Sequence, residues 1–459
     1  MTETLRCISP IDGNIIAERK TMTRAEADDA LDLSKKAQVD WAKKSIQERT
    51  KLIQSAILLL GENQEETAIE LAKQMGRPIR YGGEYSGIKF RADTLADLAE
   101  TALDPIIVED NDIFNRRIDR VPLGTVLVIA PWNYPYLAVV NTVIPALIAG
   151  NSIILKHSEQ TLLVGERIAS KFLEAGIPKG VFQNLILSHE TTGELISSNA
   201  FDFINFTGSV EGGKAMEKAA AGTFTGVGTE LGGKDPGYVR EDADLTAAVE
   251  TLIDGAMFNS GQCCCGIERI YVHENLYDQF VTKATELVSS YKLGDPLNPT
   301  TTLGPMANIR FANEVRSQIN DAINQGATRT VNTFEEDDGG AYLSPTILVD
   351  VTHDMRIMRE ETFGPVVGIM SVSGDEEAIE LMNDSDFGLT ASIWTKDDEK
   401  AYLIGSQLET GTVFMNRCDY IDPQLCWTGC KDTGRGGGLS IIGYHNLTRP
   451  KSYHLKKHT

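Results

Sequence analysis

Apolar positions recur at helical spacing over the first part of the chain. A capping box formed by Thr23 and Glu26 opens an amphipathic segment, which predicts a helix that ends near Lys44. The same periodicity predicts a second helix over about 46–75 and a third over about 83–103. These three helices precede the segments in which the pattern changes.

After these helices the pattern changes to short, continuous apolar runs separated by helical segments. Such runs are typical of parallel strands that are buried on both faces. In the first half, strands are expected at 125–130, 152–156, 182–187 and 201–206, and helices at 137–147, 162–175 and 211–221. In the second half, strands are expected at 269–272, 365–372, 390–394 and 412–416, and helices at 242–258, 276–290, 307–325 and 399–407. This alternation predicts two doubly wound α/β domains that meet near Asp235 and Pro236.

Two segments outside these domains have a looser strand pattern. They lie at 114–121, just before Pro122, and at 447–455 in the C-terminal tail. Two strands outside both cores suggest a small β arm that serves association between subunits.

Charge and composition narrow the possible functions. The chain has 43 Lys and Arg against 65 Asp and Glu, a net charge of −22. An acidic chain without a basic run is a poor binder of nucleic acid or of an anionic membrane surface. It has no apolar run of the ~18 residues that a membrane span needs, and its first residues lack a signal-peptide core. We therefore expect a cytoplasmic protein.

Seven cysteines in such a chain are expected to be free thiols, and three of them are adjacent. Cys263, Cys264 and Cys265 follow Gly261 and Gln262. Neighbouring side chains are expected to point in different directions, and the remaining cysteines lack zinc-site spacing, so no metal site is expected. From this segment alone, a nucleophilic thiol and a buried apolar cysteine are equally supported.

Two further polar residues have alternative interpretations. Glu230 precedes a Gly-Gly turn; it is either a solvated loop carboxylate or, beside a thiol or substrate, a general base. Asn133 closes the apolar run at 125–130, where open α/β sheets place ligands. Its amide could donate to an oxyanion; the alternative is that Asn133 is only a structural residue in a turn between two prolines.

Two loops follow expected strands in the manner of nucleotide sites. One contains Lys156 and Glu159, and the other runs over 206–213, just before a helix. Loops in these places bind nucleotides in many α/β proteins. The usual G-x-G-x-x-G fingerprint is absent after the first strand, so the residues alone leave ordinary connecting loops open as well.

Taken in order, the motifs resemble those of the aldehyde dehydrogenase superfamily over nearly the whole chain. They are Pro-Trp-Asn at 131–133, Phe-Thr-Gly-Ser at 206–209, Glu-Leu-Gly-Gly-Lys at 230–234, Gly-Gln-x-Cys at 261–264, Glu-Glu-Thr-Phe-Gly-Pro at 360–365 and Phe-Gly-Leu at 387–389. The resemblance implies an NAD-binding domain at 1–112 and 124–235, a catalytic domain at 236–445, and an oligomerisation arm at 113–123 and 446–459. It also implies a homodimer or homotetramer that oxidises an aldehyde with NAD, with NADP possible but less preferred.

The resemblance further implies roles for individual residues. Cys264 would be the nucleophile and Glu230 the general base, while Asn133 and the backbone amide of Cys264 would form the oxyanion hole. Cofactor contacts are implied at Trp132, Lys156, Glu159, Thr207, Gly208, Ser209, Gly213, Leu231, Glu361 and Phe363. Walls of the substrate pocket are implied at Tyr134, Asn141, Phe258, Cys263, Cys265, Asp419 and Trp427.

Some positions depart from the superfamily pattern. His157 stands where proline is common, and Phe311 stands near the usual place of a glutamine that contacts the nicotinamide ribose. Relatives that act on succinic semialdehyde often carry arginine where this chain has Asn141 and Phe258. We therefore expect an uncharged aliphatic or aromatic aldehyde as substrate.

Four alternatives remain open at this point: a semialdehyde dehydrogenase, an enzyme that transfers the acyl group to coenzyme A, an esterase that needs no cofactor, and a non-catalytic relative. Acylating enzymes usually lack the glutamate that is present here as Glu230. Cys264, Glu230 and Asn133 are all retained, which disfavours a non-catalytic protein.

Overall fold

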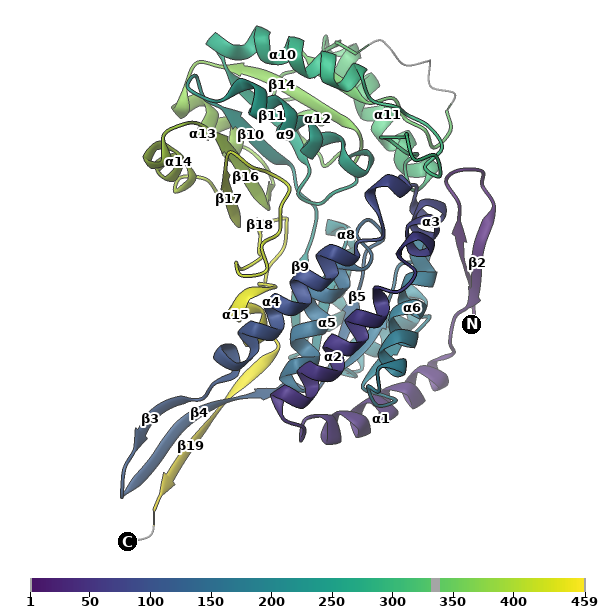
Figure 1. Ribbon diagram of the computed structural model, residues 1–459, viewed down its shortest axis with the longest axis vertical. Helices are drawn as coiled ribbons and strands as arrows, with labels where there is room; N and C mark the ends of the chain where they lie inside the picture. The colour runs from purple at the N-terminus through teal and green to yellow at the C-terminus, as the bar shows by residue number, and fades with distance from the viewer. Residues whose placement is uncertain (1, 332–338, 458–459) are drawn as a thin grey trace.

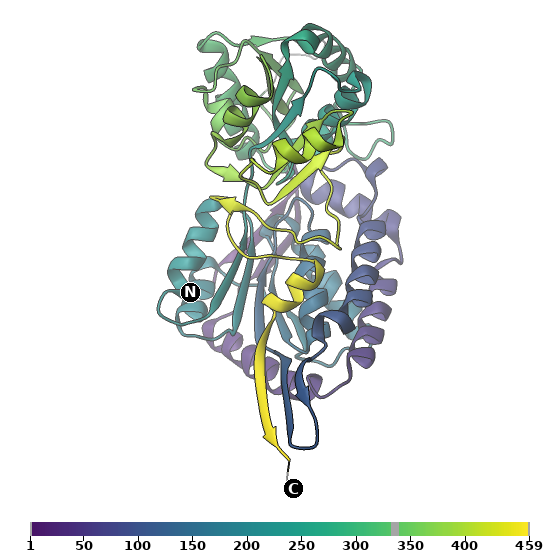
Figure 2. The same cartoon turned by 90° about the vertical axis from the view of Figure 1, so that its left-hand side faces the viewer.

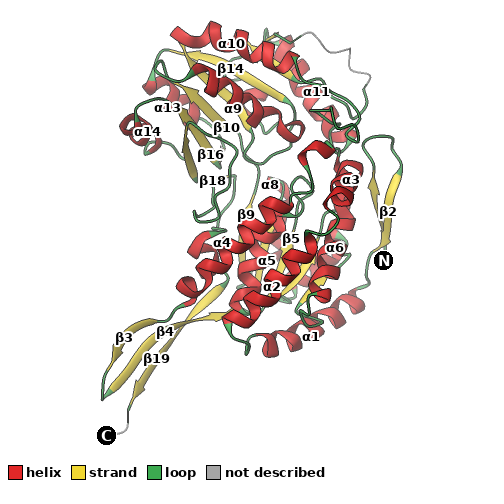
Figure 3. Cartoon of the chain, in the orientation of Figure 1, coloured by secondary structure: helices red, strands yellow, loops and turns green. Residues whose placement is uncertain are grey.

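The computed structural model describes residues 2–331 and 339–457, which form two lobes and a projecting arm (Figure 1). Each lobe is built on one large sheet, and helices cover the faces of both of these sheets (Figure 3). We call the lobe with the five-stranded sheet the first lobe and the lobe with the seven-stranded sheet the second lobe. No helix in the described part of the chain is long and apolar enough to cross a membrane.

The sheet of the first lobe is entirely parallel. Its order is β7 (Phe182–Asn184), β6 (Ser152–Lys156), β5 (Thr125–Ile129), β8 (Phe203–Thr207) and β9 (Gly226–Glu230). All residues of β5 and β6 are buried, as continuous apolar strands require. Because the order reverses on either side of β5, a crevice is expected beyond the carboxyl ends of β5 and β8.

Helices of the first lobe pack on both faces of this sheet. They are α1 (Arg24–Trp41), α2 (Ile46–Leu60), α3 (Gln64–Met75), η1 (Ile79–Tyr81), α4 (Tyr85–Leu103), α5 (Leu137–Ala149), η2 (Glu159–Thr161), α6 (Leu162–Glu174), α7 (His189–Ser197) and α8 (Val210–Ala220). The capping box at Thr23 and Glu26 is present at the start of α1, as predicted. A hairpin of β1 (Thr4–Ile8) and β2 (Ile15–Lys20) precedes them.

The sheet of the second lobe is parallel except at one edge. Its order is β12 (Thr328–Arg329), β13 (Thr346–Val349), β14 (Val366–Val372), β11 (Ile267–His273), β10 (Asp235–Val239), β16 (Thr390–Trp394) and β17 (Thr412–Met415), with β12 antiparallel to β13. Its helices are α9 (Leu245–Met257), η3 (Phe258–Gly261), α10 (Glu274–Ser289), α11 (Ile309–Asn324), α12 (Arg356–Arg359), α13 (Asp375–Asn383) and α14 (Asp398–Gly405). A two-stranded ladder joins β15 (Phe387–Gly388) to β18 (Cys430–Lys431).

The arm is a three-stranded antiparallel sheet. Its central strand β4 (Phe114–Pro122) pairs with β3 (Ile106–Asp110) and with the C-terminal strand β19 (Thr448–Lys456). Figure 2 shows β19 running from the first lobe into the arm beside the hairpin of β3 and β4. The two predicted strands therefore pair with each other. The prediction that β3 lies in the first domain was wrong, because that segment extends the arm; residues 458 and 459 of the expected arm lie outside the described residues.

One predicted helix is in fact two. The segment 46–75 breaks at Gly61 and Asn63 into α2 and α3. A side chain at Gly61 would place its Cβ 2.3 Å from the ring of Tyr85, and Asn63 has a left-handed φ of 58°. Periodicity continues across such a break because both helices bury their apolar faces in the same core.

The C-terminal helix α15 (Ser440–Asn446) belongs with the first lobe, although the predicted boundaries placed it with the second. The hydroxyl of Tyr444 donates to the carbonyl oxygen of Leu95 on α4 at 2.6 Å. The amide of Asn151 donates to the carbonyl oxygen of Leu447 at 2.9 Å. The chain thus returns from the second lobe to complete the core of the first.

Replacing Tyr444 by Phe is expected to lower the free energy of unfolding by about 1 kcal/mol, because a buried hydrogen bond is lost. Tyr402→Phe is the matched control, since Tyr402 is exposed on α14, and it should leave stability unchanged. Chemical denaturation of both variants measures the difference. Equal stability of the two variants would show that the link between α15 and α4 contributes nothing.

Candidate active site

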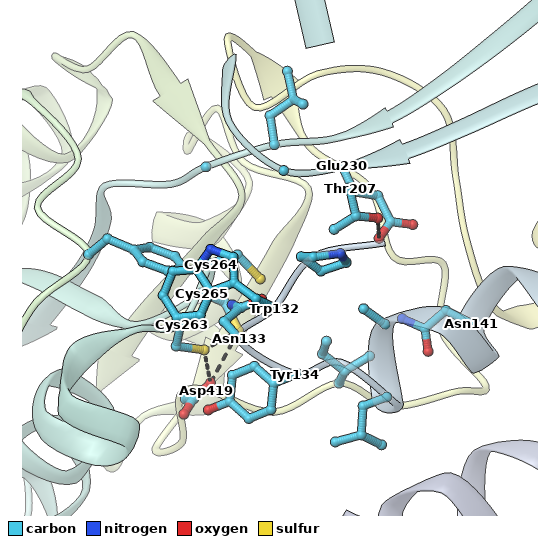
Figure 4. A pocket seen from close by; sticks show the side chains of 18 of the residues that line it. Trp132, Asn133, Tyr134, Asn141, Thr207, Glu230, Cys263, Cys264, Cys265 and Asp419 are labelled. Carbon is cyan, nitrogen blue, oxygen red and sulfur yellow. Dashed lines mark hydrogen bonds between the residues drawn. The ribbon is translucent and has the colours of Figure 1, made fainter. Parts of the chain in front are cut away.

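A cavity of about 630 Å³ is lined by residues of both lobes, many of them in loops that follow strands of the two large sheets (Figure 4). Seventeen of the predicted site residues line it: Trp132, Asn133, Tyr134, Asn141, Thr207, Gly208, Ser209, Glu230, Leu231, Phe258, Cys263, Cys264, Cys265, Glu361, Phe363, Asp419 and Trp427. Three do not. Lys156 ends β6 and Glu159 lies in the turn that follows, while Gly213 lies inside α8 and packs against Leu231.

The loop before the cysteines has a backbone that constrains its sequence. Asn259, Ser260 and Gly261 all have positive φ, of 54°, 56° and 70°. A Cβ on Gly261 would lie 2.1 Å from the carbonyl oxygen of Gly364, so glycine is required there. The side chain of Gln262 accepts from the backbone N–H of Ala307 at 2.8 Å and donates to the carbonyl oxygen of Asn259 at 3.0 Å. These contacts fix the position of the cysteines that follow.

The three thiols have different surroundings. Cys263 and Cys265 are buried, and their thiols donate to the same carboxylate oxygen of Asp419 at 3.0 and 3.2 Å. Cys264 is only half-buried, and in Figure 4 its sulfur points away from Asp419. The two neighbouring thiols lower the pKa of Cys264, whereas the pKa of Cys263 is raised. Of the three, Cys264 is best placed to react as a thiolate.

The expectation that no metal is bound depended on the three cysteine side chains pointing in different directions, and this geometric premise was wrong. The three sulfur atoms lie within 4.8 Å of one another. The tight turn between Gly261 and Gly266 brings adjacent side chains together, where an extended backbone would separate them.

The side-chain amide of Asn133 lies directly beside the cysteine loop. Its Nδ2 is 3.3 Å from the carbonyl oxygen of Gln262. Arg77 donates to the backbone carbonyl of Asn133 and pairs with Glu84, and both side chains of this pair are 3% exposed. Glu84 in turn accepts from the backbone N–H groups of Tyr136 and Leu137 at 3.1 and 2.8 Å. The buried pair therefore holds the turn that presents the Asn133 amide.

Glu230 ends β9 and faces the cavity from the side of the first lobe. Burial raises the pKa of its carboxyl group to about 7, opposed by a hydrogen bond from Thr207 and by the charge of Arg91. The Thr207 hydroxyl donates to it at 3.4 Å. A carboxyl group with a pKa near neutrality can exchange protons during turnover.

A buried network connects Glu361 and Phe363 to the strands of the second lobe. The Lys234 ammonium donates to Glu268 at 2.7 Å and to the Thr362 hydroxyl at 2.9 Å. Glu268 also accepts from the backbone N–H groups of Thr362 and Phe363, both at 2.8 Å. Glu361 accepts from the N–H of Gly233 at 3.1 Å, and burial raises the pKa of its carboxyl group to about 8.

An aromatic group covers one side of the cavity. Trp132 stacks on Phe311 with ring centroids 5.2 Å apart and contacts Phe363 edge-on at 5.6 Å. Phe311 therefore supplies an apolar surface rather than an amide. The other departure, His157, is buried against the carbonyl of Pro135, and burial lowers its pKa to about 4, so the ring is neutral.

The cavity also contains one cation that was not among the predicted site residues. Arg91 lies on α4 and lines the cavity beside Asn141. It follows Ile88 by three residues and precedes Leu95 by four, so it shares the buried apolar face of the helix. A charged residue on an apolar helical face was the available signal.

Comparison with known proteins settles the family. The model of the aldehyde dehydrogenase family matches residues 1–453. This chain belongs to the aldehyde dehydrogenase family. A succinate semialdehyde dehydrogenase of Escherichia coli K12 that uses NAD(P)⁺ is 32% identical, over 96% of this chain and 95% of that protein. Aldehyde dehydrogenases are oxidoreductases, and the predicted family and fold class are confirmed.

Solved structures of aldehyde dehydrogenases match over both lobes. The succinic semialdehyde dehydrogenase of Streptococcus pyogenes, solved with NADP⁺, is 28% identical with a TM-score of 0.93, covering 99% of this chain and 100% of that one. An NAD-dependent aldehyde dehydrogenase of Sinorhizobium meliloti is 31% identical with a TM-score of 0.93, covering 99% and 92%. Relatives of this aldehyde dehydrogenase thus bind NAD or NADP.

Limited alkylation with iodoacetamide at neutral pH should modify Cys264 before the other thiols, because its pKa is lowered and its sulfur is accessible. Cys430 is the internal control: it is also half-buried, but burial raises its pKa. Peptide fragmentation assigns the modified sulfur. Faster modification of Cys430 would contradict the reactivity order.

Proposed function

We propose that this aldehyde dehydrogenase oxidises an aldehyde to the carboxylic acid by hydrolysis of a thioester on Cys264. The thiolate adds to the carbonyl carbon, and the oxygen becomes an oxyanion. The Asn133 amide and the backbone N–H of Cys264 would donate to that oxyanion, a contribution of about 2.7–4 kcal/mol for one such donor. The carbon then loses hydride and a thioester remains.

The cofactor surface of the cavity fits a nicotinamide dinucleotide. The loop of Gly208 and Ser209 leads directly into the N-terminus of α8, which is a favourable place for a pyrophosphate. Glu361 and Phe363 are held on the opposite side by the network around Lys234. When bound, the nicotinamide ring supplies the hydride acceptor.

The presence of Glu230 favours hydrolysis of the thioester over transfer of the acyl group to coenzyme A. It would remove a proton from the water that attacks the thioester, and the acid and the Cys264 thiolate would then be released. Its position in the cavity and a pKa of about 7 support this role. This single residue is the observation on which the hydrolytic assignment depends.

We infer a preference for NAD⁺ over NADP⁺ from the end of β6. Lys156 is buried there and Glu159 is exposed in the following turn. A carboxylate at Glu159 can accept from both ribose hydroxyls and would repel a 2′-phosphate. Lys156 could bind that phosphate, so some use of NADP⁺ is expected.

The arm supports a proposed homodimer or homotetramer. Ile106, Ile107 and Val108 on β3 are 59%, 55% and 59% exposed. Adjacent apolar side chains on a projecting edge strand favour burial against another copy. We retain an NAD-binding role for the first lobe, a catalytic role for the second and a cytoplasmic enzyme as parts of the same proposal.

The expectation that the substrate is an uncharged aldehyde depended on a substrate pocket that contains no cation. Arg91 lines the cavity, so that premise was wrong. The semialdehyde alternative is therefore favoured, and relatives with that printed activity support it.

Steady-state NADH formation with NAD⁺ and an aldehyde tests the proposal. Cys264→Ala should abolish it, while Cys263→Ala and Cys265→Ala, the matched controls, should retain most of it. Added coenzyme A should not raise the rate, and kcat/KM should be higher with NAD⁺ than with NADP⁺. Loss of activity only in Cys263→Ala would show that Cys263, and not Cys264, is the nucleophile.

The hydrolytic step should depend on the ionisation of Glu230. Because its pKa is raised to about 7, the base form decreases below that pH, and kcat should fall about tenfold per pH unit there. Glu230→Gln should give a burst of NADH without steady turnover. Stopped-flow absorbance measures both, and an unchanged steady rate in the variant would remove Glu230 from the mechanism.

A further inference from the structure

Arg91 is the only lysine or arginine among the described residues that line the cavity. It extends from the face of α4 that also carries Ile88, Ala92 and Leu95, and it is 9% exposed. The mechanism proposed above assigns it no role. A buried cation in a reaction cavity needs a physical reason, because removing it from water is costly.

The hydrogen bonds of Arg91 leave part of its guanidinium group unpaired. Its Nη1 donates to the Asn141 side-chain oxygen at 2.8 Å and to the carbonyl oxygen of Leu137 at 3.1 Å. Within residues 2–331 and 339–457, no carboxylate lies within the 4.0 Å of an ion pair with it. Two buried cations beside the cavity do have a carboxylate partner, since Arg77 pairs with Glu84 and Lys234 with Glu268.

The acidic groups of the cavity do not supply the missing charge. Burial raises the pKa of the carboxyl groups of Glu230, Glu361, Asp254 and Asp419, which disfavours their ionised forms. Glu314 is exposed and pairs with Arg356. An anion beside Arg91 therefore meets one cation, and burial disfavours the charged forms of the nearby acidic groups.

The position of Arg91 defines a subsite away from the thiol. Gly87 and Phe90 of α4 and Leu137, Ala138 and Asn141 of α5 line the same part of the cavity. Figure 4 shows Asn141, which accepts from Arg91, well apart from the three cysteines, with Glu230 above Asn141 in this view. A ligand held at both Cys264 and Arg91 therefore extends from the cysteine loop toward α4 and α5.

We propose that Arg91 binds the carboxylate of a short aldehyde that carries its acid group at the end opposite the reactive carbon. This rests on the proposed function, which places the aldehyde carbon at Cys264. The Nε and Nη2 donors of Arg91 are available for such an anion, and a carboxylate matches the planar guanidinium group with two parallel hydrogen bonds. Asn141 and Leu137 hold the guanidinium group in place through Nη1. The substrate class is thus an ω-carboxylated aldehyde.

A rival role for Arg91 is general electrostatic support. Its charge acts on Glu230 and on Cys264, so it could serve every aldehyde equally. That role predicts lower kcat for all substrates and a shifted pH profile. A carboxylate anchor instead predicts a change in KM that depends on the charge of the substrate.

The test compares succinic semialdehyde with 4-methylpentanal, in which an isopropyl group replaces the carboxylate at the same chain length. Wild type should prefer the semialdehyde. Arg91→Met should lower the ratio of the two kcat/KM values by roughly 10- to 100-fold, mainly through KM, since a hydrogen-bonded charge is lost. Arg91→Lys keeps the charge but not the fork and should retain part of the preference.

Arg49→Met is the matched control for removing a buried arginine. Arg49 lies on α2, outside the cavity lining, and donates to the carbonyl oxygen of Ile148 at 2.7 Å. It should leave the ratio unchanged. Calorimetric titration with succinate gives a second readout that needs no turnover, and Arg91→Met should weaken that binding at least about tenfold.

The outcomes separate this inference from the proposed function. If wild type forms no NADH with either aldehyde but Arg91→Met loses succinate binding, the dehydrogenase proposal fails and the carboxylate site stands. If wild type prefers 4-methylpentanal, or if Arg91→Met lowers both kcat values equally and shifts the pH profile, the inference is overturned. Should Arg91→Met fail to fold, the preference of wild type and its partial retention in Arg91→Lys decide.

Discussion

The buried ion pair between Lys234 and Glu268 is the contact on which the geometry of the site depends most. The side chains are 0% and 5% exposed, so they have lost their hydration. Removing one partner of such a pair typically costs 3–5 kcal/mol, because the other charge is left buried and alone. Lys234 lies in the connection between β9 and β10, just after Glu230. Glu268 lies on β11 and holds the backbone of Thr362 and Phe363. One pair thus links the connection that follows Glu230 to the loop of Glu361 and Phe363 and to the second sheet.

A second constraint fixes the reacting groups relative to each other. The positive-φ turn at 259–261 packs against Gly364, and Gln262 ties it to Ala307. Asn133 approaches the same turn from β5, held by the pair of Arg77 and Glu84. The proposed oxyanion hole is therefore built from two loops of different lobes that contact each other before any substrate binds, which is the preorganisation that electrostatic catalysis requires.

The sequence predicted those elements whose own residues determine them. β5, β6 and β16 are short strands of mainly apolar or small residues, and every one of their residues is buried. β9 and β10 were missed because β9 contains two glycines and β10 contains Pro236, beside which the register shifts. Neighbouring strands, rather than local preference, make these segments extended. Arg91 was missed for a related reason: its place on the apolar face of α4 indicates burial, but only the packing of α4 on α5 brings it into the cavity.

The return of the chain to the first lobe affects how the protein is made. Tyr444 contacts Leu95, 349 positions earlier, and Leu447 contacts Asn151, 296 positions earlier. During synthesis, most of the first lobe emerges from the ribosome before α15 and β19 exist, so the side of α4 that contacts Tyr444 and one edge of β4 are still uncovered. The lobe that is translated first is therefore completed last. The apolar surface of the first lobe stays exposed until the second lobe and the C-terminal segment have been translated. A prematurely terminated chain would leave that surface exposed and prone to aggregation.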